Sequence, residues 1–143
     1  MRVRRLLPLL LCLSTACASA RTTGSFVDRP ATQAMRALAG DAARQLALLY
    51  PPASTQLSLR GRLDDEFGRA LVTELRGHGF AVAEATPRGS QLAIAYVVDD
   101  IAQLYRVLLY VRSSTRNITL ARVYAYRDAS LRAASTWTQQ ERP

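Results

Sequence analysis

The residue types that could carry chemistry are few in this sequence and are poorly placed to act together. A hydrolytic triad or a zinc site needs histidine with cysteine or carboxylate partners, and the chain has one histidine, His78, between two glycines. That position is typical of a helix end, where a histidine interacts with the helix dipole. The pairs Asp64-Asp65 and Asp99-Asp100 cannot converge on one substrate atom, because adjacent side chains diverge on a helix or strand. We therefore expect no catalytic, cofactor-binding or metal-binding residue, and no enzymatic activity.

Both cysteines, Cys12 and Cys17, fall within residues 1–20, which have the order of an export signal. Three arginines precede the apolar run Leu6–Leu13, and small residues follow. The run is too short to cross a bilayer core, which takes about 20 residues. Once this segment is processed, the chain holds at most one cysteine, so its stability must come from a hydrophobic core and not from a disulfide.

Two processing routes compete for this leader. Leu13–Cys17 resembles a bacterial lipobox, in which the cysteine is diacylated and becomes the first residue, although Ser14 stands where leucine is usual. Ala18–Ala20 also matches the A-x-A site of ordinary signal peptidase, which would release a soluble periplasmic protein. We favour lipidation at Cys17, and Ala18 after it points to the outer membrane. Several acyl chains on one residue are enough for a stable anchor to the membrane.

The rest of the chain is long enough for one domain and too short for two. The formal net charge of +8 falls to +5 without the three leader arginines. The remaining arginines are spread along the chain without a basic run, so we expect no direct binding of nucleic acid. The expected organisation is a signal peptide at 1–20, a tether at 21–29 and a single domain at 30–143. Phe26-Val27 is the apolar part of the tether, and it either docks on a partner or covers the domain's own edge.

The centre of the chain predicts a β-α-β unit. Leu57 and Leu59 alternate with polar residues, the pattern of a half-buried strand. Asp64 is placed to cap a helix whose apolar face includes Leu71 and Leu75. Gly79 is placed to end that helix in the left-handed conformation, and a second strand then starts at residue 80.

The flanking segments predict one more helix and four more strands. Apolar residues at helical spacing indicate a helix over residues 30–49, which could kink or restart at Gly40-Asp41. Strands are expected at 91–98, 104–112, 118–126 and 131–140, with Asp99-Asp100 in a connection and Trp137 in the last strand. The expected fold is α+β, with two helices on one face of a mostly antiparallel sheet of five or six strands, in the order α-β-α-β-β-β-β.

Several of these strands are apolar on both faces, which two helices on one side cannot explain. Residues 91–98 and 104–112 place apolar side chains at both odd and even positions. A partner subunit, an added strand or a second copy of the chain is expected to cover the other face. Val107 and Leu109 are candidates for the outward set, although strand alternation alone does not decide which set faces out.

The segments LALLYPPAST, DEFGRALVTELRGHGFAV and LYRVLLYV, behind a lipoprotein-like leader, resemble the conjugal transfer protein TrbH family. The resemblance covers residues 33–126 and the leader. It implies a non-catalytic outer-membrane lipoprotein of the type IV secretion system for plasmid conjugation, with other envelope proteins of that system as partners and a homo-oligomer as an option. Cys17 is the one site residue that carries over. The alternative is a periplasmic lipoprotein that assists assembly or activation of another envelope complex.

Overall fold

The computed structural model describes residues 26–27, 32–61, 63–83, 92–101, 104–127 and 130–142. The expected signal peptide with Cys17, and most of the expected tether, lie outside these residues. The predictions made for them therefore stay predictions.

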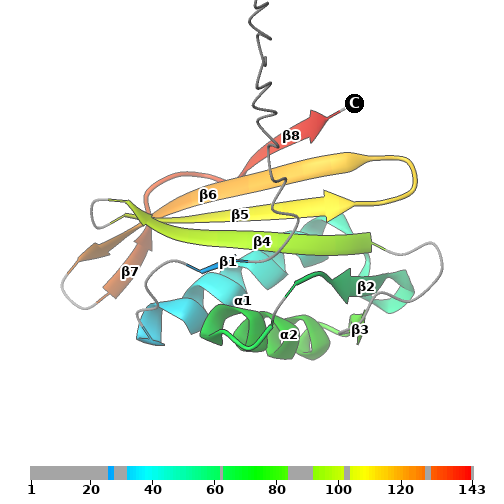
Figure 1. Cartoon of the computed structure of the whole chain (residues 1–143), viewed down its shortest axis with the longest axis horizontal. Coiled ribbons are helices and arrows are strands. Elements are labelled where there is room, and N and C mark those ends of the chain that lie inside the picture. The colour runs from blue at the N-terminus through cyan, green and yellow to red at the C-terminus, as the bar shows by residue number, and fades with distance from the viewer. Residues whose placement is uncertain are drawn as a thin grey trace, which may run out of the picture.

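The chain forms two helices and a mixed sheet, which confirms the α+β class. Helices α1 (Thr32–Leu49) and α2 (Glu66–Gly77) lie on the same side of the sheet (Figure 1). The strands are β1 (Phe26–Val27), β2 (Gln56–Leu59), β3 (Ala81–Ala83), β4 (Leu92–Ile101), β5 (Leu104–Arg112), β6 (Asn117–Arg127), β7 (Ser130–Ala133) and β8 (Thr138–Arg142). A short 3-10 helix, Pro52–Ser54, connects α1 to β2.

The order of strands in the sheet is β3-β2-β4-β5-β6-β7, with β1 also paired to β4 and β8 also paired to β6. The first three strands make parallel pairs, and β4 to β8 make antiparallel pairs. Strands β7 and β8 lie toward opposite ends of β6 (Figure 1). Strand β1 shows that the Phe26-Val27 backbone covers an edge of the domain's own sheet, where it pairs with Val97 and Val98.

The predicted β-α-β unit is confirmed, with a correction at the start of its helix. Strands β2 and β3 are parallel neighbours, and α2 connects them. The N-cap is Asp65 and not Asp64, because Asp65 is the last residue with an extended backbone and its carboxylate accepts the Gly68 N–H at 2.8 Å. At the other end His78 is the C-cap and Gly79 has a φ of 91°, as predicted.

Three other sequence predictions need correction. Helix α1 runs without a break through Gly40-Asp41, so no restart occurs there. Strand β4 continues to Ile101, and Asp99-Asp100 therefore lies within the sheet, where Asp99 pairs with Arg106 of β5. The expected strand 131–140 is two strands, because the backbone N–H groups of residues 134 and 135 both bond to the Val123 carbonyl and turn the chain before β8. Trp137 lies in that connection.

One face of the sheet packs against both helices and forms the hydrophobic core. The strand residues of this inner face alternate along each strand, as the pleat requires. They are Ile94, Tyr96 and Val98 of β4, Tyr105, Val107, Leu109 and Val111 of β5, and Ile118, Leu120 and Tyr124 of β6. The helices contribute Met35, Leu38, Leu46, Phe67, Leu71 and Leu75, among others. The predicted burial of Leu71 and Leu75 is confirmed.

The choice of outward candidates on β5 was wrong. Val107 and Leu109 are both fully buried, because the two helices cover the odd-numbered positions of this strand. The even-numbered positions, among them Arg106, Leu108 and Tyr110, therefore face away from the helices. Ser58 of β2, expected on a half-exposed face, is also buried.

Candidate functional site

The face of the sheet turned away from the helices is the largest feature that the core does not use. We call it the outward face and define it by the residues of β4, β5 and β6 that alternate with the core set. They are Ala93, Ala95, Val97, Asp99 and Ile101 of β4, Leu104, Arg106, Leu108, Tyr110 and Arg112 of β5, and Asn117, Thr119, Ala121, Val123 and Ala125 of β6. Most of these side chains are apolar.

Exposure on the outward face increases along β4 toward the β4–β5 hairpin, whereas on β5 Tyr110 is exposed near the opposite end. Ala93 and Ala95 are buried, and Val97, Leu108 and Ala121 are half-buried. Tyr110 is 37% exposed, Leu104 39% and Ile101 52%. Large apolar side chains with this much exposure are those that a partner surface commonly covers. The expectation of an apolar second face is therefore met in the structure, with the even-numbered residues of β5 at its centre.

Asp99 and Arg106 form an ion pair on this apolar face. The Arg106 guanidinium donates to both carboxylate oxygens of Asp99, with Nε to Oδ1 at 3.1 Å. These hydrogen bonds raise the pKa of Arg106, so the side chain stays charged. The bidentate geometry lets the two charges neutralise each other. At this point of the face a partner would meet a neutral pair and not an isolated charge.

A second polar feature is a hydrogen bond that joins the N-cap of helix α2 to β4. The Asp65 carboxylate, which caps α2, also accepts the Tyr96 hydroxyl at 2.5 Å. The Tyr96 ring is fully buried and packs on Phe67 with 4.8 Å between ring centroids. Burial first, and then the bond to Asp65, raise the pKa of Tyr96 far above its ordinary value. The hydroxyl keeps its proton at neutral pH and works as a hydrogen-bond donor.

Gly68 makes room for this hydroxyl. A Cβ atom at Gly68 would lie 2.3 Å from the Tyr96 Oη and 3.2 Å from the Leu63 Cα. Carbon and oxygen atoms cannot approach so closely without a shift of one of them. The first turn of α2 therefore needs a glycine at position 68, because the Tyr96 side chain from the sheet comes too close for any larger residue.

A third polar feature joins helix α1 to β6 and to the connection before β8. The Asp41 Oδ2 atom accepts the Tyr124 hydroxyl at 2.6 Å, Arg122 Nη1 at 2.7 Å and Trp137 Nε1 at 3.1 Å. Arg44 donates to the other oxygen at 3.2 Å. Burial raises the pKa of Asp41, but the hydrogen bond from Tyr124 and the charge of Arg122 outweigh it, so the pKa is lowered overall.

Both aspartates therefore act as structural anchors between a helix and a strand. Their carboxylate oxygens are occupied by hydrogen-bond donors, and the tyrosine partners have pKa values well above their ordinary value. Neither group is arranged to exchange a proton with a substrate at neutral pH. These anchors are not among the features predicted from the sequence, although a charged Asp41 among the apolar positions of its helix is a usable signal.

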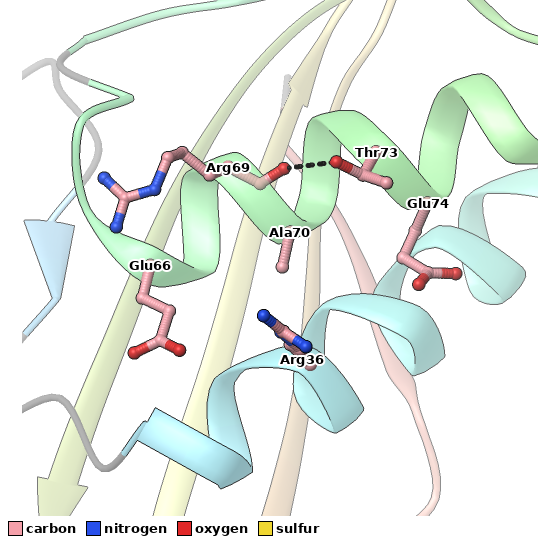
Figure 2. Close-up of a pocket in the computed structure, with 6 residues that line it drawn as sticks. All are labelled: Arg36, Glu66, Arg69, Ala70, Thr73 and Glu74. Carbon is pink, nitrogen blue, oxygen red and sulfur yellow. Dashed lines mark hydrogen bonds between the residues drawn. The ribbon is translucent and has the colours of Figure 1, made fainter.

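Two surface clefts are lined by described residues. The larger, of about 370 Å³, lies between the helices and is lined by Arg36, Glu66, Arg69, Ala70, Thr73 and Glu74 (Figure 2). Figure 2 shows Arg36 of α1 directed toward Ala70 of α2, and the Thr73 hydroxyl bonded to the Arg69 carbonyl at 3.0 Å. The lining mixes two positive with two negative side chains, most of them exposed, and so does not select a ligand of one charge.

The smaller cleft, of about 260 Å³, lies at the end of α1 and is lined mostly by hydroxyl groups. Two of these hydroxyls are occupied by local turns: Ser54 donates to the Pro51 carbonyl, and Ser113 bonds to Arg116. Within the described residues no group of three or more His, Cys, Asp or Glu side chains is arranged to hold a metal ion. Neither cleft brings together the groups that a hydrolytic or metal-dependent reaction requires.

The residues singled out from the sequence end up far apart in this fold. His78 lies at the C-terminal end of α2, Asp65 in the α2 anchor and Asp99 on the outward face. Tyr96, Tyr105 and Tyr124 are buried in the core, whereas Tyr110 lies on the outward face. The sequence-predicted lipidation site, Cys17, lies outside the described residues.

Fold and site together define a small α+β domain whose buried polar groups hold its helices in place and whose sheet keeps one apolar face open. Among the described helices, none has both the length and the apolar character needed to cross a membrane. The family described as conjugal transfer protein TrbH matches residues 20–141, and the chain belongs to this family. Membership implies involvement in conjugal transfer together with other conjugation machinery. No curated protein and no solved structure matches the chain.

Proposed function

We propose that the protein is a non-catalytic lipoprotein of a conjugative type IV secretion apparatus, anchored to the outer membrane through Cys17 with its domain in the periplasm. The observation that carries the proposal is the family match over residues 20–141, which covers all of the described domain except Arg142. The lipobox-like sequence that ends at Cys17 precedes this matched region directly. In this proposal residues 18–29, which include the tether, join the anchor to the domain.

The arrangement of charges supports a role in assembly and not in contact with the transferred DNA. Arg44 and Arg122 pair with Asp41, Arg106 pairs with Asp99, and Arg116 pairs with Glu141. Binding to DNA depends on unpaired basic groups gathered along one surface. In this domain several arginines are already neutralised by neighbouring carboxylates, and they lie on different elements.

The outward face supports the same role. The two helices are fixed to the inner face by the Asp41 and Asp65 anchors, so the outward face is an apolar surface that remains available for contact with another chain. Contact through a preformed surface needs no rearrangement of the domain.

The anchor is tested by metabolic labelling of donor cells with a clickable palmitate analogue. We expect the wild-type chain to be labelled and to sediment with outer membranes. Cys17→Ser should abolish the label and lower the frequency of plasmid transfer. Cys12→Ser is the matched control, since it changes the other leader cysteine and should leave both readouts unchanged.

An unlabelled wild-type protein that starts at Arg21 would refute the lipid anchor and favour a soluble periplasmic protein. If the protein is labelled but deletion of its gene leaves plasmid transfer unchanged, the alternative is favoured, in which a periplasmic lipoprotein assists assembly or activation of another envelope complex.

A further inference from the structure

Large and small side chains alternate between β5 and β6 across the outward face. In the observed register Leu104 lies beside Ala125, Leu108 beside Ala121, and Tyr110 beside Thr119. At each of these rows β5 carries the larger side chain and β6 the smaller. The outward face therefore has a ridge along β5 and a shallow trough along β6.

A ridge beside a parallel trough is complementary to a second copy of itself. A twofold axis that runs along the strands, between β5 and β6 and above the sheet, places β5 of one copy over β6 of the other. Leu108 then meets Ala121 of the second copy, and the reverse contact forms at the same time. Reciprocal contacts of this kind are characteristic of twofold homodimers. If the partner were a different protein, the ridge along β5 and the trough along β6 would not both need to be present on this chain.

The charges on this face are compatible with its being covered. Asp99 and Arg106 neutralise each other within one chain, so a second copy would bury a satisfied pair there, and Arg112 lies at the exposed end of the face. In the same arrangement residues 93–97 of β4 lie over β8 of the second copy. The described residues of β8, Thr138, Gln139, Gln140 and Glu141, are polar and exposed, which gives an apolar centre with a polar rim.

The available area is sufficient for a specific contact. Strands β4, β5 and β6, about 4.8 Å apart with nine paired residues at about 3.3 Å per residue, together with the five residues of β8, form a face of roughly 510 Å². Two copies would bury roughly 1,000 Å² in total, which matches the ~1,000 Å² that a specific interface needs. Two sheets that pack face to face lie about 10 Å apart with strands nearly aligned, as in a β-sandwich.

We propose that the outward face is the interface of a homodimer in which β5 of each copy packs over β6 of the other. The inference concerns copy number and register and does not depend on how the protein is anchored or on which apparatus it serves. It is therefore tested separately from plasmid transfer.

The test uses full-length chains with two different epitope tags, produced in the same cells and captured through one tag after solubilisation in detergent. Wild-type chains should capture each other. Leu108→Asp paired with itself, and Ala121→Arg paired with itself, should each reduce capture by more than about tenfold, because each puts unpaired charges into an apolar contact. Ser114→Asp, on the exposed β5–β6 turn, is the control and should capture as the wild type does.

The decisive pair is Leu108→Asp in one chain with Ala121→Arg in the other. In the proposed register one of the two reciprocal contacts then joins an aspartate to an arginine, and capture should recover to within about threefold of the wild type. Thermal unfolding followed by circular dichroism checks that each variant remains folded. Native mass spectrometry of the wild-type chain gives an independent copy count.

A wild-type mass of one copy would overturn the proposal. So would undiminished capture by Leu108→Asp paired with itself, or a failure of the mixed pair to recover while both variants are folded. A different envelope protein retained through Leu108 in place of a second copy would overturn it too, and would assign the outward face to that protein.

Discussion

Gly68→Ala tests the α2 anchor directly, because it should destabilise the domain although helices normally favour alanine over glycine. Alanine in place of glycine inside a helix normally raises the free energy of unfolding by about 1 kcal/mol. At Gly68 the new Cβ would lie 2.3 Å from the Tyr96 Oη. The tyrosine must therefore move, and its hydrogen bond with Asp65 is lost.

The magnitude follows from these opposing contributions. A hydrogen bond to a charged group contributes about 1.5–3 kcal/mol, and a polar group left buried without its partner costs about 1–3 kcal/mol. The moving Tyr96 ring also loses part of its packing on Phe67. Both figures describe the loss of one hydrogen bond and are not summed, so with the lost packing the cost is roughly 2–4 kcal/mol. After subtraction of about 1 kcal/mol for the helix preference, we expect Gly68→Ala to lower the free energy of unfolding by about 1–3 kcal/mol.

Urea unfolding followed by circular dichroism measures this free energy, and the same helix supplies the control. A Cβ atom at Gly77 would meet nothing within 4 Å, so Gly77→Ala should be neutral or stabilising by up to about 1 kcal/mol. In a Tyr96→Phe background the clashing hydroxyl is absent, and Gly68→Ala should cost at least about 1 kcal/mol less than in the wild type. If Gly68→Ala stabilises the domain as Gly77→Ala does, the reasoning about Tyr96 is wrong.

Two further predictions concern the helices. Leu71→Ala should cost about 2–5 kcal/mol of the free energy of unfolding in urea, because the side chain is fully buried, whereas Thr73→Ala on the exposed side of α2 should stay within about 0.5 kcal/mol. The pKa of Asp41 is lowered in the folded state, so its stabilisation is present above the unfolded value of about 3.9 and is lost as pH falls through the folded pKa. In thermal melting curves, the Asp41→Asn variant should have a lower melting temperature than the wild type at neutral pH, and its melting temperature should fall less on acidification. A fall as large as that of the wild type would contradict this prediction.

Features that depend on neighbouring residues could be predicted from the sequence. Strand β5 has the bounds expected from its apolar run, residues 104–112, because a run between turn residues is a local signal. Helix α2 ends at Gly77 with Gly79 in the left-handed conformation, since a glycine two residues past a helix is itself the cause of the stop. The N-cap moved by one residue because Asp64 and Asp65 have the same side chain. The choice between them depends on which of the two carboxylates the Tyr96 hydroxyl contacts in the folded domain.

Features that depend on contacts between distant residues could not be predicted. Asp41 and Tyr124 are 83 residues apart, and no local pattern joins them. The inner and outer positions of β5 are both apolar, so the sequence does not show which set the helices cover. A shift by one residue exchanges the two sets, which is why Val107 and Leu109 were placed on the wrong face while the two-sided character of the strand was correct.

The positions of the two anchors indicate how a small domain can keep an apolar face open without losing its own fold. Tyr96 lies on β4 and Tyr124 on β6, the two neighbours of β5 in the sheet. Each tyrosine bonds to an aspartate of a different helix or its cap, so the helices are held on both sides of the central strand. A helix can leave the inner face only if a buried hydrogen bond breaks, which costs about 1–3 kcal/mol before any apolar surface is exposed. The inner face therefore stays closed, and a partner that binds β5 must do so from the outward side, at Leu108 and its neighbours.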